Sequence, residues 1–194
     1  MRIIAGKYRS RPLRSLPGMD IRPTSDRLRE TLFDVLCAGN PESLAGTIWL
    51  DLYAGTGAVG IEALSRGASK VYFAEPSKAA ADLIAANLKS LGIATSFEIA
   101  RTEAAKAIRQ WEVRDDVSGI RPHFVFLDPP YRLKDEYART LAALAESRLL
   151  PSDAIVIAEH EKRFDPGEVF ASLHRYRELK QGDAALSFYR RPES

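Results

Sequence analysis

The sequence lacks several features that would place it in a specialised class of protein. Among its 194 residues there is one cysteine, Cys37, so no disulfide can form within the chain and we expect a reducing, cytoplasmic environment. No run of about eighteen apolar residues occurs, and no apolar secretory segment opens the chain, so we expect no association with a membrane. The three histidines, His123, His160 and His174, lack the spacing of metal ligands, and we expect no metal site.

The overall composition, with 45% hydrophobic and 28% charged residues, and the chain length are typical of one globular domain. We expect a monomer. The net charge of +2 conceals an asymmetry, because residues 1–30 hold eight cationic and three acidic residues, so the rest of the chain carries −3. A basic segment on a mildly acidic body is typical of a clamp for the phosphate backbone of a nucleic acid. A solvated tail is the alternative interpretation.

From Thr47 onward, strand-like and helix-like patterns alternate, which predicts an α/β fold with a parallel sheet covered on both faces. We predict strands at about 47–53, 70–75, 96–100, 123–128 and 154–159, with helices near 58–66, 78–91, 102–112 and 134–147. A closing β-hairpin is predicted from 174–180 and 184–190. Residues 1–23 are predicted to form a short basic β-arm, followed by one domain, 24–194, that opens with a helix ending near Ala38.

A glycine-rich turn follows the first strand of this alternation. Gly55, Gly57 and Gly60 match the pattern G-x-G-x-x-G, and Asp51 stands just before them at the end of the strand. Glu75 ends the next predicted strand, 20 residues after Gly55. Glycines allow the backbone to approach a ligand closely, and a carboxylate at the next strand end can bind two ribose hydroxyls. The turn therefore predicts a site for a cofactor that carries a nucleoside.

The second motif ends the strand predicted at 123–128 and consists of Asp128, Pro129, Pro130 and Tyr131. Two prolines cannot continue a central strand, so the chain must leave the sheet here, at the edge where α/β proteins bind their ligands. The carboxylate and the backbone carbonyls could accept the two N–H bonds of an amino group on a flat ring. Tyr131 could cover the face of that ring. The motif therefore predicts a site for an aromatic amine.

The position of Asp51 distinguishes two kinds of cofactor. A pyrophosphate binds a helix N-terminus that is free of negative charge, because the amide dipoles there attract the anion. A carboxylate just before the glycines suits a cation instead, such as the ammonium group of a methionyl moiety. A nicotinamide dinucleotide remains the alternative, but it gives no role to Asp51 or to the second motif.

The two motifs together resemble those of class I S-adenosylmethionine-dependent methyltransferases. Four segments resemble one family among them, the RsmD family: residues 1–7 (MRIIAGK), 22–33 (RPTSDRLRETLF), 62–68 (EALSRGA) and 126–131 (FLDPPY). The likeness implies a Rossmann-like, mostly parallel seven-stranded sheet with an antiparallel hairpin at its end. It also implies S-adenosylmethionine as cofactor and methyl transfer to N2 of a guanine, guanine(966) of 16S ribosomal RNA in the small subunit.

The resemblance assigns roles to individual residues. Where the family usually has Asp-Ala-Leu, this chain has Glu103-Ala104-Ala105, so Glu103 takes the place of the acid that binds the adenine amino group. The expected catalytic residues are Asp128, Pro129, Pro130 and Tyr131, and the expected cofactor residues are Asp51, Tyr53, Gly55, Gly57, Glu75 and Glu103. The expected RNA-binding residues are Lys7, Arg9, Arg11, Arg14, Arg22 and Arg27.

Two other functions fit parts of the pattern. The chain could methylate another amino group, such as adenine N6 or a protein glutamine, although those enzymes more often have Asn at the position of Asp128. It could also be a non-catalytic RNA-binding assembly factor that has kept the fold. The intact glycine turn beside an intact Asp128 motif argues against that loss of activity.

Overall fold

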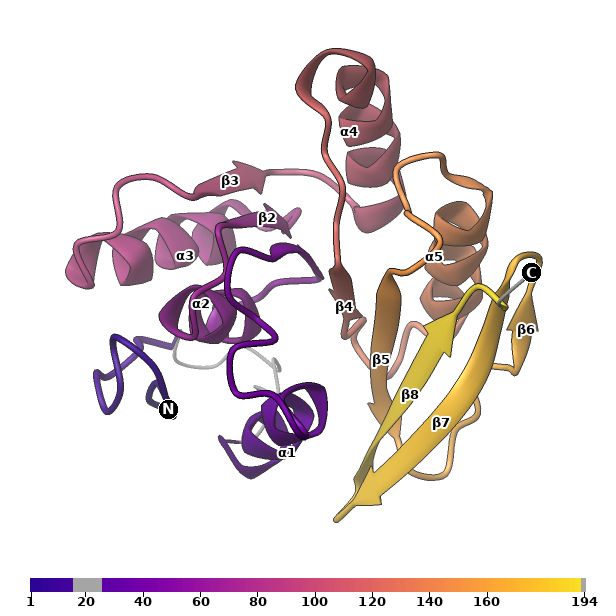
Figure 1. Ribbon diagram of the computed structural model, residues 1–194, viewed down its shortest axis with the longest axis horizontal. Helices are drawn as coiled ribbons and strands as arrows, with labels where there is room; N and C mark the ends of the chain where they lie inside the picture. Colours follow the sequence, from indigo (N-terminus) through magenta and orange to yellow (C-terminus); the bar gives the residue numbers. More distant parts are fainter. Residues whose placement is uncertain (16–25, 193–194) are drawn as a thin grey trace.

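A computed structural model describes residues 1–15 and 26–192 of the chain, and within them it has five helices and eight strands (Figure 1). The helices are α1 (Asp26–Leu36), α2 (Ala58–Ser65), α3 (Lys78–Ser90), α4 (Ala104–Ser118) and α5 (Asp135–Glu146). The strands are β1 (Ile48–Leu52), β2 (Lys70–Ala74), β3 (Phe97–Ala100), β4 (Phe124–Leu127), β5 (Ile155–Glu161), β6 (Val169–Phe170), β7 (Leu173–Gln181) and β8 (Ala184–Arg190).

All eight strands form one sheet in the order β3-β2-β1-β4-β5-β8-β7-β6. The first five strands in this order are parallel, and β8, β7 and β6 are added antiparallel. This arrangement confirms the predicted α/β class, the mostly parallel sheet and the closing hairpin. The seven predicted strands are all present, and β6 adds an eighth at the edge of the sheet. Two residues are too few to give the sequence a strand periodicity, so β6 could not be predicted.

The sheet separates two hydrophobic clusters, because alternate residues of a strand point to opposite faces. Trp49 and Phe126 belong to the cluster that includes residues of α1, α2 and α3. Leu50 and Val125 belong to the cluster that includes residues of α4 and α5. Figure 1 shows the same division, with α4 and α5 on one side of the sheet and α1 and α2 on the other.

The helix ends follow the capping residues in the sequence. Ser77 caps α3 by accepting a hydrogen bond from the N–H of Ala80, as its position predicts. Gly67 follows α2 with a φ of 103°, a conformation that favours glycine. The helix α4 extends past the predicted end at residue 112, because no glycine interrupts it before Gly119, which has a φ of 62°.

The described part of the predicted N-terminal arm, residues 1–15, packs against α2 and α3. Its strand-like pairing is limited to one bridge between Arg2 and Pro12, so it is less regular than the β-arm that the sequence predicts. Ile3 is buried, and the carboxylate of Glu62 accepts the N–H bonds of Ile4 (2.8 Å) and Ala5 (2.9 Å). These contacts make residues 1–15 a docked part of the domain surface.

The arm meets α2 so closely that one position requires glycine. Gly6 has a φ of 80°, and a Cβ atom there would lie 1.9 Å from the carbonyl oxygen of Ser65. The N–H of Lys7 donates to that same oxygen. The rest of the predicted arm, residues 16–23, including Arg22, and the first two residues of the predicted domain lie outside the described residues. Among the described helices, none is long and apolar enough to cross a membrane.

Candidate active site

A cavity of about 600 Å³ opens at the carboxyl edge of the parallel strands. It lies between β1 and β4, where the chain leaves neighbouring strands in opposite directions, which is where open α/β sheets bind ligands. The volume is in the range of small-molecule sites. Predicted site residues that line the cavity are Asp51, Tyr53, Gly55, Glu75, Glu103, Asp128, Pro129, Pro130 and Tyr131. The structure therefore brings the two sequence motifs into one site.

The turn after β1 is built from left-handed backbone conformations. Tyr53, Gly55 and Gly57 have φ values of 64°, 54° and 75°. Gly57 does not line the cavity, and a Cβ atom there would lie 3.1 Å from the side chain of Ile84. Gly60 also serves packing, because its Cβ would lie 2.4 Å from the ring of Phe73. Of the three motif glycines, only Gly55 therefore faces the cavity.

Asp51 is buried at the base of this turn, with 2% of its surface exposed. Its Oδ2 accepts the N–H bond of Gly60 in the first turn of α2, at 2.9 Å. Burial raises the pKa of Asp51 to about 7, and the nearby Glu75 carboxylate adds to the rise. The carboxylate thus occupies the position at this helix N-terminus that an anion would otherwise take.

Glu75, at the end of β2, also holds the turn with its carboxylate. Its Oε2 accepts the N–H bond of Gly55 at 2.9 Å, and its Oε1 accepts that of Ser77 at 2.8 Å. Burial is the main cause of a raised pKa for Glu75. Each carboxylate oxygen can accept more than one hydrogen bond, so hydroxyl groups of a ligand could still bind here.

The second motif forms the opposite wall of the cavity. Pro129 is buried directly after β4, whereas Asp128 and Tyr131 are partly exposed at the cavity surface. The hydroxyl of Tyr137, on α5, is placed between the carbonyl oxygens of Glu159 (2.9 Å) and Pro129 (3.4 Å). Burial raises the pKa of Tyr137, so its hydroxyl remains a neutral donor. Its single proton is donated to the nearer carbonyl, that of Glu159, and the contact with Pro129 is weaker.

Several residues of the site were not predicted from the sequence. Tyr53 was predicted as a site residue, but its contacts with α5 were not. Its hydroxyl donates to Oε2 of Glu136 (2.8 Å) and lies 2.6 Å from Oγ1 of Thr140. Arg132, Leu133 and Glu136 line the cavity as well. Their position directly after the Asp128 motif was the available signal, because the start of the following helix must lie at the same edge of the sheet.

The other predicted groups lie at or beyond the rim. Glu103 is exposed, and its carbonyl oxygen accepts the N–H bonds of Lys106 and Ala107 at the start of α4. The predicted RNA-binding residues do not line the cavity. Lys7, Arg9, Arg11, Arg14 and Arg27 are exposed on residues 1–15 and α1, and Arg22 lies outside the described residues. The side chain of Arg11 donates to the carbonyl oxygen of Ser90 at 3.1 Å.

A buried side chain links the arm to the cavity. Asn87, on α3, accepts the N–H bond of Arg14 (2.9 Å) and donates to the carbonyl oxygens of Arg14 (3.2 Å) and Thr56 (3.1 Å). Thr56 belongs to the cavity wall. No group of three or more His, Cys, Asp or Glu side chains that could hold a metal ion occurs in the described part of the chain.

The sheet order, the antiparallel closing strands and the two motifs at one edge define a class I methyltransferase fold. A family model described as "Conserved hypothetical protein 95" matches residues 1–190. The chain belongs to this family, which is the RsmD family that the sequence motifs indicated.

Relatives with known names agree with this assignment. The ribosomal RNA small subunit methyltransferase D of Escherichia coli K12 is 31% identical over 98% of this chain and 90% of its own length. The protein of the same name from Haemophilus influenzae is 36% identical over 84% of this chain and 79% of its own. The solved structure of the yhhF protein of E. coli superposes with a TM-score of 0.80 at 29% identity, covering 100% and 99% of the two chains.

Proposed function

We propose that this protein transfers a methyl group from S-adenosylmethionine to the exocyclic N2 of a guanine in 16S ribosomal RNA of the small subunit. The observation that carries the proposal is the single cavity lined by both the glycine turn and residues 128–131. One motif suits a nucleoside-bearing cation and the other suits an aromatic amine. The names of the E. coli and H. influenzae relatives support ribosomal RNA as the substrate.

The residues of the glycine turn fit S-adenosylmethionine better than a dinucleotide. Asp51 already accepts the N–H of Gly60 at the N-terminus of α2, so a pyrophosphate there would meet a carboxylate. An ammonium group would instead gain a charged partner in a buried site. Glu75 would accept the ribose hydroxyls, and Glu103, at the rim, would accept the adenine amino group. The bound cofactor would supply a methyl group made electrophilic by its sulfonium.

The second motif would hold the amine that is methylated. Guanine N2 is a weak nucleophile, because its lone pair is delocalised into the ring. If Asp128 and the carbonyl of Pro129 accept its two N–H bonds, the lone pair is directed away from both acceptors. Orientation of this kind can contribute several kcal/mol to catalysis. The hydroxyl of Tyr137 lies behind the motif, 3.4 Å from the carbonyl oxygen of Pro129. Tyr131 would stack on the base, and Asp128 would receive the proton released after transfer.

The RNA must present an unstacked guanine, because N2 of a paired guanine lies in the Watson–Crick edge. The exposed cations of residues 1–15 and α1 would contact its phosphates. A transfer assay tests the proposal: the purified protein is incubated with small-subunit particles and methyl-labelled S-adenosylmethionine, and the RNA is digested to nucleosides. We expect the label in N2-methylguanosine. Label in N6-methyladenosine or in protein would favour one of the other amino-group substrates, and an absence of label would favour the assembly factor.

A further inference from the structure

The hairpin of β7 and β8 contains an irregularity that places an aromatic side chain on the surface. Arg175 pairs with Tyr189 and Arg177 pairs with Phe188, so Tyr176 is an extra residue in β7. Such a β-bulge reorients a side chain and is common near functional sites. Tyr176 is 44% exposed, which makes it one of the few large hydrophobic side chains at the surface.

Arginine side chains surround this tyrosine. The guanidinium of Arg190 lies 4.8 Å from the centre of the Tyr176 ring, and that of Arg177 lies 5.8 Å from the centre of the Phe188 ring. The ring of Tyr176 in turn lies 6.3 Å from that of Phe188. The hairpin, residues 173–190, holds four Lys or Arg and two Asp or Glu residues. We call Tyr176, Arg177 and Arg190 the hairpin surface.

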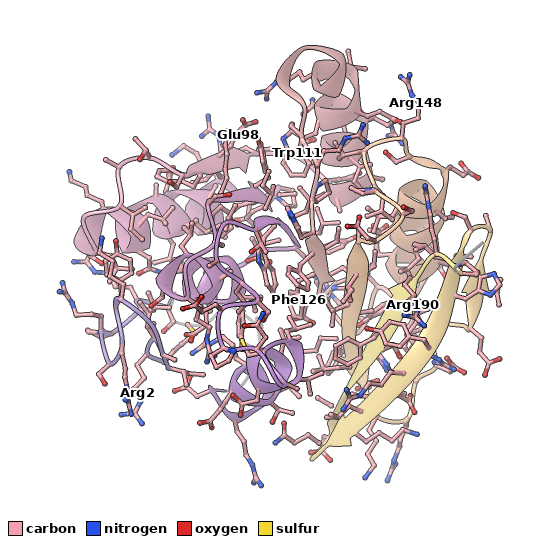
Figure 2. The ribbon with its side chains drawn as sticks, in the orientation of Figure 1. Arg2, Glu98, Trp111, Phe126, Arg148 and Arg190 are labelled. Atoms are coloured by element: carbon pink, nitrogen blue, oxygen red, sulfur yellow. The ribbon has the colours of Figure 1, made fainter. Side chains whose placement is uncertain are left out.

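The register of the sheet places this surface towards the amino ends of the parallel strands, because Tyr189, just before Arg190, pairs with Val156 near the start of β5, whereas the cavity opens at their carboxyl ends. Arg177 pairs with Phe188, Phe188 with Ile157, and Ile157 with Phe126, which lines the cavity. Phe188, Ile157 and Phe126 share one hydrophobic cluster, so they lie on the same face of the sheet. Three strand spacings of about 4.8 Å separate Arg177 from Phe126, or about 14 Å of backbone. Figure 2 shows Arg190 on the hairpin and Phe126 near the centre of the domain.

We propose that the hairpin surface is a second RNA contact, distinct from the basic N-terminal residues. A base of the RNA stacks on Tyr176, and the adjoining phosphates bind Arg177 and Arg190. A positively charged surface with an exposed aromatic ring is the arrangement by which proteins bind single-stranded RNA without reading its sequence. The proposal rests on the proposed function, because it takes the occupant to be the strand that carries the methylated guanine. The alternative is that Tyr176 and Arg177 only cover Phe188.

Two substitutions at one position separate stacking from covering. Tyr176→Phe keeps the ring, whereas Tyr176→Leu keeps an apolar cover without one. We expect Tyr176→Leu to weaken binding of small-subunit RNA by about tenfold, and Tyr176→Phe to bind nearly as the wild type does. Val169→Ala, at the neighbouring exposed strand β6, is the matched control and should change nothing. Equal RNA affinity of all four proteins, at equal thermal stability, would overturn the proposal.

A charge substitution gives a second readout. Arg177→Gln should lower the slope of the logarithm of affinity against the logarithm of salt concentration by about 0.7, the value for one phosphate contact on a single strand. Arg148→Gln, at an exposed arginine before β5, is the control and should leave the slope unchanged. An unchanged slope for Arg177→Gln would contradict the phosphate contact.

These measurements are independent of the chemistry of methylation. RNA affinity is measured without the methyl donor, so a protein that methylates no RNA could still show the loss in Tyr176→Leu. In the opposite case, the wild type methylates guanine while Tyr176→Leu binds RNA normally, and only the hairpin surface is refuted. The affinity for S-adenosylhomocysteine should be the same in every variant, because the hairpin surface does not line the cavity.

Discussion

The two ends of the cavity differ in how far they are built before any ligand binds. At the glycine turn, the carboxylates of Asp51 and Glu75 are buried and already accept backbone N–H bonds. At the other end, Asp128 and Tyr131 are partly exposed at the cavity surface. The difference indicates that substitutions in the glycine turn change stability as well as the proposed cofactor binding, whereas Asp128 can be changed with little effect on folding.

The largest expected effect is at the substrate end. We predict that Asp128→Ala lowers methyl transfer by at least about 100-fold, because the amine loses its orientation and its proton acceptor. Affinity for S-adenosylhomocysteine, measured by calorimetry, should stay within about twofold of the wild type, and thermal stability should be similar. A parallel loss of cofactor affinity would show that Asp128 belongs to the cofactor end, and the contrast between the two ends would then fail.

At the cofactor end, Asp51→Asn should change stability and binding in opposite directions. Burial raises the pKa of Asp51 to about 7 from an ordinary value of 3.8, so the folded protein holds a proton there that the unfolded chain loses. The contribution of Asp51 to the free energy of unfolding is therefore present at low pH and is lost as the pH rises through about 7. Asparagine can still accept the N–H of Gly60 and has no such dependence.

Between about pH 4 and pH 8 the wild type should therefore lose on the order of 4 kcal/mol of unfolding free energy relative to Asp51→Asn. Denaturant unfolding at several pH values measures this difference. Calorimetry with S-adenosylhomocysteine should show weaker binding by the variant. It should also show wild-type affinity that rises with pH through about 7, because the ammonium favours ionised Asp51. Preference for NAD over this ligand would contradict the assignment of the cofactor.

Gly60→Ala tests the close packing beneath the turn. A methyl group at this position would lie 2.4 Å from the ring of Phe73, so α2 must move away from β2. We expect a loss of about 1–3 kcal/mol of stability. Gly92→Ala is the comparison, because Gly92 follows α3 with a φ of 73°, which disfavours alanine, but a methyl group there would meet no atom within 4 Å, whereas Gly60 lies within α2. A smaller loss in Gly60→Ala than in Gly92→Ala would show that backbone conformation matters more than packing.

The smallest effect is expected from the N-terminal cations, which lie away from both ends of the cavity. Replacing Arg9, Arg11 and Arg14 with Ala should weaken RNA binding modestly and lower the salt slope by up to about 1 for each phosphate that is no longer bound. Arg11 donates to Ser90, so part of its effect should appear as lower stability. An unchanged salt slope on small-subunit particles would remove these three residues from the RNA site.

The order of helices and strands and the two motifs could be predicted, because each depends on residues close together in sequence. The interactions that fix the site could not. Glu62 binds the backbone of Ile4 and Ala5 across 58 and 57 positions, and Tyr53 meets Glu136 across 83. A glutamate within an apolar helix and a tyrosine after a strand carry no local sign of such partners. For the same reason, the sequence predicted Gly57 as a cofactor contact, although its side-chain position faces Ile84.

The most direct test of the account is mass mapping of methylated nucleotides in small-subunit RNA from cells with and without this gene. We predict that one N2-methylguanosine in 16S ribosomal RNA is lost in the deletion strain. The wild-type gene should restore it, and a gene with Asp128→Ala should not. An unchanged methylation pattern in the deletion strain, or full restoration by Asp128→Ala, would contradict the account.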